Sequence, residues 1–126
     1  MNADTNTRLS VVVPVYNEGD VLQAFQHRLL AVLEECGHPF DILYVDDGSD
    51  PECEQCLQSL RDAHPAVALL QLSRNFGKEV AVSAGLEHVT GDAVIVIDAD
   101  LQDPPELIPE FVRQWQAGYD VVDHDA

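Results

Sequence analysis

The stretch Leu-Ser-Val-Val-Val-Pro-Val, residues 9–15, decides which fold we expect for this chain. It is short and rich in valine, and polar residues do not alternate with apolar ones along it. Such a run is typical of a strand covered on both faces, as strands are in parallel sheets with helices packed on each side. Three further apolar runs predict strands at residues 40–45, 67–72 and 93–97.

Between these runs, apolar residues recur with the spacing of one helix face. Helices are expected at residues 19–36 and 79–89 and, with aspartate caps, after Asp50 and Asp103. Strands that alternate with helices through short loops predict an α/β fold with an open, mainly parallel sheet and helices on both faces. Residues 121–122 resemble the start of a fifth strand, so we expect the sheet to be incomplete at its C-terminal end.

Length and composition exclude several classes of protein. A chain of 126 residues is one domain by length. Its formal net charge of −17 argues against a nucleic-acid partner, which requires a basic surface. Apolar runs fall well short of the roughly 20 residues that span a bilayer, and the polar N-terminus lacks the apolar segment of a signal peptide. We therefore expect a cytoplasmic location for the chain as given.

The cysteines point to packing rather than chemistry. Three cysteines cannot all pair with one another, which fits a reducing compartment. Cys53 and Cys56 have the spacing of a redox motif, but they share one face of the predicted helix with Leu57 and Leu60. Cysteine behaves as a small apolar residue in such a stripe, so core packing is favoured over redox chemistry or metal binding.

Polar residues follow each predicted strand, and parallel strands bring their carboxyl ends to one edge of the sheet. Open α/β sheets bind their ligands at that edge. The residues expected there are Tyr16, Asn17, Glu18, Asp46, Asp47, Arg74, Asn75, Lys78, Asp98, Asp100 and Gln102. Asp98 and Asp100 are two positions apart, so their side chains lean to one side of an extended backbone, and Gln102 falls in step with them. Three oxygen donors of this kind suit a hard divalent cation, Mg²⁺ or Mn²⁺.

Several of these residues also have a simpler structural interpretation. Asn17 is a good cap for the first helix, and one of the acids Asp46 and Asp47 is expected to be structural in a turn. Two of the six basic residues, Arg74 and Lys78, lie within five positions of each other at a strand end, which favours an anion site over ordinary surface charges.

Four segments, taken together, carry a resemblance to a known family. They are VPVYNE (13–18), VDDGS (45–49), SRNFGK (73–78) and DADLQDPP (98–105). In this order and spacing they resemble the family 2 glycosyltransferases, and more narrowly the branch that transfers sugars to polyprenyl phosphates such as dolichyl or undecaprenyl phosphate. The resemblance runs from about Leu9 to Val122. It implies a GT-A type fold and a nucleotide-diphosphate sugar, linked to UDP or GDP, as donor.

The resemblance also implies roles for particular residues. Pro14, Tyr16 and Glu18 would line the nucleoside pocket, and Asp47 would bond the base. Lys78, and with less weight Arg74, would lie near the nucleotide. Asp98, Asp100 and Gln102 match the residues that hold the metal on the donor diphosphate, and Asp98 and Asp100 would be the catalytic pair.

The chemistry agrees with this assignment. Cleavage of the bond between sugar and diphosphate creates a highly charged leaving group, which a divalent cation stabilises. An acceptor phosphate monoester has a second pKa of about 6 and is already a nucleophile at neutral pH, so a strong general base is unnecessary. We expect a single in-line displacement that inverts the anomeric carbon.

The chain departs from the family in length. Family members are longer and carry acceptor-binding and membrane segments beyond this region. Residues 1–126 are therefore expected to be the nucleotide-sugar-binding part of a GT-A domain, which binds donor and metal weakly and does not turn over alone. The full-length protein is expected at the cytoplasmic face of the inner membrane.

Two alternatives belong to other classes of protein. A non-catalytic nucleotide-binding or regulatory module predicts nucleotide binding that is insensitive to Asp100→Asn. A phosphoacceptor receiver domain also clusters acids on an α/β sheet, but it needs its acid pair after the first strand. Here the pair Asp46 and Asp47 follows the second strand, which makes the receiver domain the weaker alternative.

Overall fold

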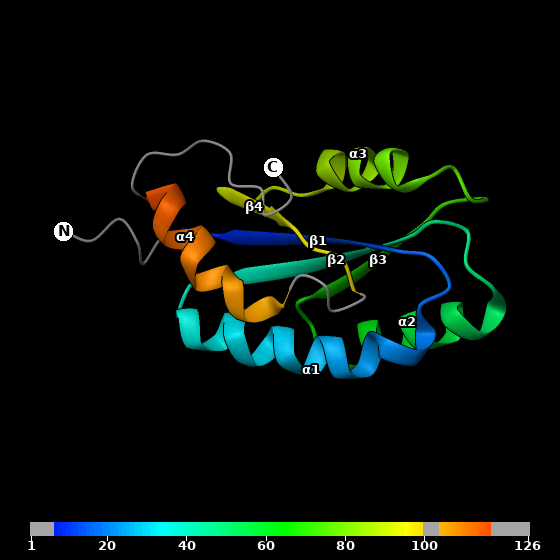
Figure 1. Ribbon diagram of the computed structural model, residues 1–126, viewed down its shortest axis with the longest axis horizontal. Coiled ribbons are helices and arrows are strands. Elements are labelled where there is room, and N and C mark those ends of the chain that lie inside the picture. Colours follow the sequence, from blue (N-terminus) through cyan, green and yellow to red (C-terminus); the bar gives the residue numbers. More distant parts are fainter. Residues whose placement is uncertain (1–6, 100–103, 117–126) are drawn as a thin grey trace.

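Four parallel strands form one sheet in the computed structural model, which describes residues 7–99 and 104–116 (Figure 1). The strands are β1 (Leu9–Val15), β2 (Phe40–Asp46), β3 (Val67–Gln71) and β4 (Ala93–Val96), in the spatial order β3-β2-β1-β4. All seven residues of β1 are buried, as predicted for a strand covered on both faces. The predicted α/β class with a parallel sheet is confirmed.

The chain changes direction across the sheet at β1. From β1 it runs outward through β2 to β3, and then returns to place β4 on the other side of β1. Val11 is therefore paired with Ile42 on one side and with Ile95 on the other. In sheets of this kind the point of reversal leaves a crevice at the carboxyl ends of the two diverging strands, which is where ligands bind.

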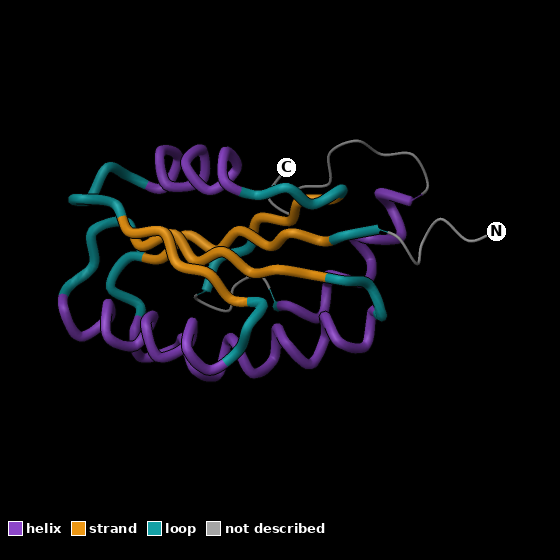
Figure 2. Tube along the Cα trace, turned by 180° about the vertical axis from the view of Figure 1, so that it is seen from behind, coloured by secondary structure: helices purple, strands orange, loops and turns teal. Residues whose placement is uncertain are grey.

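Helices cover both faces of the sheet, but unequally (Figures 1 and 2). One face carries α1 (Gly19–Cys36), α2 (Pro51–Ala63) and α4 (Ile108–Gln116), the last preceded by the 3₁₀ turn η2 (Pro105–Leu107). The other carries α3 (Lys78–His88), which packs on β1 and β2. We call these the α1 face and the α3 face.

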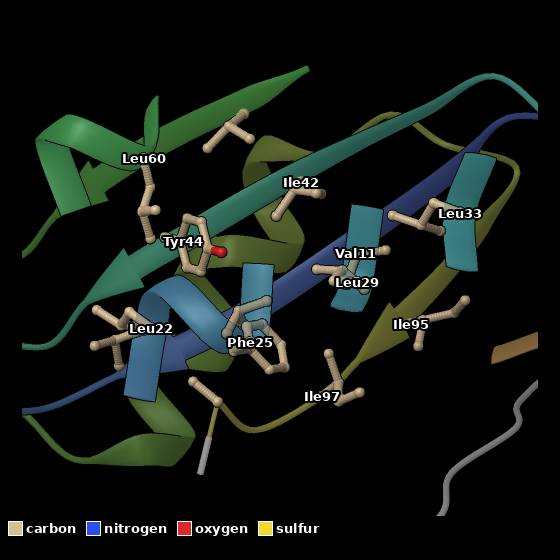
Figure 3. Close-up of a cluster of buried hydrophobic side chains, with 14 of the residues drawn as sticks. Val11, Leu22, Phe25, Leu29, Leu33, Ile42, Tyr44, Leu60, Ile95 and Ile97 are labelled. Atoms are coloured by element: carbon tan, nitrogen blue, oxygen red, sulfur yellow. The ribbon is translucent and has the colours of Figure 1, made fainter. Parts of the chain in front are cut away.

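The main core lies on the α1 face. Leu22, Phe25, Leu29 and Leu33 form the apolar stripe of α1, and all four are fully buried against the sheet (Figure 3). Because strand side chains alternate between faces, Val11 and Val13 join this core, whereas Val12 belongs to a smaller cluster under α3.

Local sequence signals set the helix boundaries much as predicted. Gly37 ends α1 in the left-handed region at φ +76°, a conformation that glycine adopts without strain. Asp50 caps α2, because its Oδ1 accepts the N–H of Cys53 at 2.9 Å, and Pro51 takes the first helical position.

The cysteine-bearing helix packs as the stripe predicted. Cys53 and Leu57 are buried in the core, and Cys56 is partly buried beside it. All three cysteines of the chain are free thiols. Burial, followed by the nearby Cys53, raises the pKa of the Cys56 thiol, so the reactive thiolate is disfavoured.

Some predictions fall on residues that the structure does not describe. Asp100, Gln102, Asp103 and the expected strand at residues 121–122 are among them. Within the part of the chain that is described, no helix combines the length and the apolar character needed to cross a membrane.

Candidate functional site

A cleft of about 370 Å³ opens at the carboxyl ends of the strands, beside the point where the sheet reverses. It is lined by Pro14, Val15, Tyr16, Glu18, Asp47, Lys78 and Asp98. These residues come from the ends of β1, β2 and β4 and from the start of α3. The structure thus brings together six of the side chains that the sequence singled out, from segments up to 84 positions apart.

The end of β1 forms one wall of the cleft. Tyr16 is 48% exposed, and its aromatic side chain can offer an apolar surface to a ligand. Glu18 turns back on this segment, and its Oε1 accepts the backbone N–H of Tyr16 at 3.2 Å. Glu18 also occupies the N-cap position of α1 without a capping side-chain hydrogen bond.

Asn17 does not cap α1, so that prediction is wrong. Its backbone is in the left-handed region at φ +54°, and its side-chain Oδ1 accepts the N–H of Asp50 at 2.8 Å. Its own N–H donates to Ser49 Oγ at 2.9 Å. Asn17 therefore joins the loop after β1 to the loop after β2, because the two loops lie side by side and each has backbone groups to satisfy.

The two acids at the end of β2, Asp46 as its last residue and Asp47 directly after it, are both buried, and both accept backbone hydrogen bonds. Asp46 stays within its own turn, where its Oδ1 accepts the N–H of Ser49 at 2.9 Å. Asp47 reaches the loop before α3, where its carboxylate accepts the N–H of Phe76 at 2.8 Å and that of Gly77 at 3.0 Å. The expectation that one of the two is structural is met by Asp46, whereas Asp47 has a structural role and lines the cleft as well.

The opposite wall carries an ion pair. Lys78, the first residue of α3, places its Nζ 2.8 Å from Oδ2 of Asp98, which follows β4. The side chains are 54% and 24% exposed, so the pair faces solvent at the mouth of the cleft. Lys78 is the one basic residue among those that line the cleft, against Glu18, Asp47 and Asp98. The positive charge of Lys78 would attract an anion that enters the cleft.

Arg74 is not brought into the cleft. Its guanidinium lies over the ring of Phe76, 4.9 Å from the ring centre, and Arg74 is not among the lining residues. This contact within the loop uses the flat cation on a flat aromatic face, which an exposed arginine does readily. Of the two basic residues predicted to lie near the nucleotide, Lys78 lines the cleft and Arg74 does not.

Of the three predicted metal ligands, Asp98 lies within the described residues and lines the cleft. Asp100 and Gln102 lie outside the described residues. Within residues 7–99 and 104–116, no three histidine, cysteine or acidic side chains converge closely enough to hold an ion.

Sequence reasoning placed Asn75 at this edge of the sheet but gave it no task, and it missed the partners of Asp47. Asn75 Nδ2 donates to the Asp47 carboxylate and to its backbone carbonyl, both at 3.2 Å. A signal was available in Asn75-Phe-Gly, a turn-forming stretch whose backbone N–H groups need acceptors, but nothing local pairs it with an acid 28 residues earlier.

Comparison with known proteins identifies the family of this chain. The sequence pattern of the family described as glycosyl transferase family 2 matches residues 10–125. The chain is 44% identical over 115 residues to a prophage bactoprenol glucosyl transferase homologue of Escherichia coli. The matched region makes up 91% of this chain and 38% of that protein. It is 47% identical over 116 residues to the undecaprenyl-phosphate 4-deoxy-4-formamido-L-arabinose transferase of Pseudomonas fluorescens, covering 90% of this chain and 34% of that one.

A solved structure shares the fold. The mannosyltransferase PcManGT of Pyrobaculum calidifontis, in complex with GDP-Man and Mn²⁺, superposes with a TM-score of 0.72 at 26% identity, over 89% of this chain and 33% of the other. The predicted GT-A type fold is confirmed by this likeness. The chain spans about a third of the length of the proteins it matches. Because the family pattern extends over nearly all of the sequence, the chain belongs to glycosyl transferase family 2.

Proposed function

We propose that residues 1–126 are the donor-binding part of a glycosyltransferase that moves a sugar from a UDP- or GDP-linked donor to a polyprenyl phosphate. The observation that carries this proposal is the cleft itself, in which residues from three strand ends and the start of α3 converge. Tyr16 offers a ring surface to the nucleoside, and Lys78 offers a cation to the diphosphate. Two of the relatives are named as transferases for bactoprenol and for undecaprenyl phosphate, which supports a lipid phosphate as acceptor.

The residues present fit a divalent cation. Asp98 directs a carboxylate toward the cleft, and the family resemblance adds the carboxylate of Asp100 and the amide oxygen of Gln102. Oxygen donors of this kind hold Mg²⁺ or Mn²⁺. Such an ion, when bound, stabilises the negative charge that develops on the leaving nucleoside diphosphate.

The reaction proposed is a single displacement. An oxygen of the acceptor phosphate attacks the anomeric carbon, a new carbon–oxygen bond forms on the face opposite the donor phosphate, and the bond to the nucleoside diphosphate breaks. The configuration at that carbon is thereby inverted. A phosphate monoester already carries the charge it needs at neutral pH, so this reaction does not require the chain to supply a strong general base.

Nucleotide binding by the chain itself tests the proposal. We expect UDP or GDP to raise the thermal unfolding temperature in the presence of Mn²⁺, and calorimetry to detect binding that is much weaker without the ion. Lys78→Met is expected to weaken binding about tenfold or more, because a hydrogen bond to a charged group contributes about 1.5–3 kcal/mol.

A matched control is Arg61→Met, which removes an exposed positive charge from α2, outside the cleft lining. It should leave nucleotide affinity unchanged. Equal losses in the two variants would show that Lys78 acts through the overall charge of the protein, and the cleft would then lose its assignment.

Glycosyl transfer is expected to require more chain than these residues. The relatives are about two and a half times as long, so acceptor binding and membrane attachment at the cytoplasmic face of the inner membrane are proposed for the longer protein. The purified 126-residue chain, given a nucleotide sugar, Mn²⁺ and undecaprenyl phosphate in detergent, should release no nucleoside diphosphate above background. Measurable release would contradict this expectation.

A further inference from the structure

We propose that Asp47 is a positioning residue: its carboxylate holds residues 75–77 against the end of β2 and thereby fixes Lys78 at the mouth of the cleft. The inference rests on the proposed function, since it concerns how the protein positions Lys78 to bind the donor diphosphate. It goes further by giving Asp47 a task other than direct contact with the base.

The hydrogen bonds of Asp47 are already nearly complete without a ligand. Its Oδ1 accepts the N–H of Phe76 at 2.8 Å, and its Oδ2 accepts the N–H of Gly77 at 3.0 Å and Nδ2 of Asn75 at 3.2 Å. An ionised carboxylate offers about four acceptor positions, so three are occupied. With the side chain buried, at most one position is left for a base.

These bonds act at the point where α3 begins. Gly77 has φ +105°, a conformation that favours glycine, and its carbonyl accepts the N–H of Ala81 at 3.0 Å in the first turn of the helix. Lys78 follows directly. Because Asp47 binds the two N–H groups just before Lys78, it sets both the start of α3 and the position from which the lysine reaches Asp98 at 2.8 Å.

A second observation, independent of the carboxylate, shows that the two loops are in contact. Gly48 has φ +75°, and a Cβ at this position would lie 2.4 Å from the backbone carbon of Arg74 and from the nitrogen of Asn75. The segment before α3 therefore lies directly on the turn after β2. Asp47 precedes Gly48 in this turn, so its side chain reaches the segment from where the two backbones are in contact.

Amide exchange tests the positioning without any ligand. In Asp47→Asn the side chain keeps one acceptor oxygen but presents an NH₂ group to the other donor. We expect the amides of Phe76 and Gly77 to exchange at least about tenfold faster by NMR than in the wild type. Asp46→Asn is the matched control, because it neutralises a buried acid one position away whose partner is Ser49. It should change these two rates by less than about twofold.

Binding then separates positioning from direct contact. The probes are Mn²⁺ with inorganic pyrophosphate, which has no base, and Mn²⁺ with UDP or GDP. Positioning predicts that Asp47→Asn weakens both by a similar factor, about tenfold, and has little further effect once Lys78→Met is present. A direct contact with the base predicts a loss for the nucleotide and none for pyrophosphate.

Each result decides the matter. Unchanged exchange at Phe76 and Gly77 in a folded Asp47→Asn protein would overturn the inference, as would pyrophosphate binding that Asp47→Asn leaves intact. If the wild type binds neither probe, the proposed function fails. The exchange rates, which need no ligand, still show in that case whether Asp47 holds the segment before α3.

Discussion

The two faces of the sheet are built differently. On the α1 face, three helices bury long side chains such as Phe25 of α1, Leu57 of α2 and Ile108 of α4 in one large core. On the α3 face, a single helix meets the sheet through small residues, and the buried cluster consists of Val12, Leu43, Val45 and Ala81. The same strand, β1, contributes to both, because its side chains alternate between faces.

This difference between the faces means that one mainly stabilises the protein, whereas the other positions a residue of the cleft. The α1 face holds most of the buried apolar side chains of the described residues, so it contributes most of the hydrophobic free energy. On the α3 face the helix lies very close to the sheet instead, since a Cβ on Gly85 would lie 2.7 Å from Val12 Cγ1 and 3.0 Å from Val45 Cγ2. The helix that lies so close to the sheet is the one that begins with Lys78. The face with the smaller apolar core is thus the one that presents Lys78 to the cleft.

The largest expected effect comes from the same substitution made on each face. Leu29→Ala, in the α1-face core, should cost about 4–5 kcal/mol of unfolding free energy, near the top of the range for buried leucine. Leu43→Ala lies on the α3 face, where the leucine is 7% exposed. It should cost nearer about 2 kcal/mol of unfolding free energy, because fewer atoms surround the cavity that the substitution leaves. Urea unfolding of both variants measures the difference. Equal costs, or a larger cost at Leu43, would remove the contrast between the faces.

A smaller effect is expected from a polar pair inside the α1-face core. The hydroxyl of Tyr44 donates to Gln26 Oε1 at 2.9 Å, and Gln26 Nε2 donates to the carbonyl of Leu60 at 3.3 Å. Tyr44→Phe leaves the buried Oε1 without its donor and should cost about 1–3 kcal/mol in the same assay.

Burial also raises the pKa of Tyr44 above its ordinary range, so the phenol stays protonated and remains a donor at alkaline pH. Absorbance should therefore show no ionisation of this tyrosine until the protein unfolds. The control is the set of Tyr44→Phe, Gln26→Leu and the double variant, because Gln26→Leu also removes the Nε2 donor to the Leu60 carbonyl in both proteins that carry it. If the losses of the two single variants simply add in the double variant, the hydrogen bond is not the cause of the Tyr44→Phe loss.

The close approach of α3 to the sheet predicts that Gly85→Ala lowers the stability of the protein, although helix propensity alone predicts an increase. Alanine is favoured over glycine inside a helix by about 1 kcal/mol, yet Gly85→Ala should destabilise the protein by about 1 kcal/mol. The reason is that its Cβ would overlap the branched side chain of Val12. Thermal unfolding measures the sign directly, and adding Val12→Ala should recover part of the loss. A rise in unfolding temperature for Gly85→Ala would show that α3 lies less tightly on the sheet.

The smallest effect concerns an exposed ion pair that joins α1 to η2. Arg28 Nε donates to Glu106 Oε2 at 3.1 Å, and this hydrogen bond lowers the pKa of Glu106 below its ordinary value. A carboxyl whose folded pKa is the lower one contributes stability above the unfolded pKa, and loses it as the pH falls through the folded pKa. The side chains are 38% and 52% exposed, so solvent screens the pair.

Glu106→Gln should therefore lower the unfolding temperature slightly at pH 7 and not at all near pH 3. Glu87→Gln, an exposed acid on α3, serves as the control at both pH values. A Glu106→Gln effect of the same size at pH 3 would mean that packing, rather than charge, joins α1 to η2.

Much of the fold could be predicted because its signals are local. The valine-rich run of β1 predicted burial on both faces, and the cap at Asp50 and the glycine at position 37 predicted where helices begin and end. The candidate site was predicted for the same reason. In a parallel sheet the residue after each strand lies at one edge, so chain order alone places Tyr16, Asp47 and Asp98 together.

The sequence by itself therefore determined the strands, the helices and the edge at which the polar residues gather, since each follows from contacts between near neighbours in the chain. Only the tertiary structure decided that β4 returns to the side of β1, that Asn17 joins two loops instead of capping a helix, and that Arg74 lies on Phe76 while Lys78 meets Asp98. It also decided the partners of Asp47, which lie 28 to 30 positions away. Such pairings depend on how closely two separate segments approach, and that distance is set by packing across the whole sheet rather than by any local pattern.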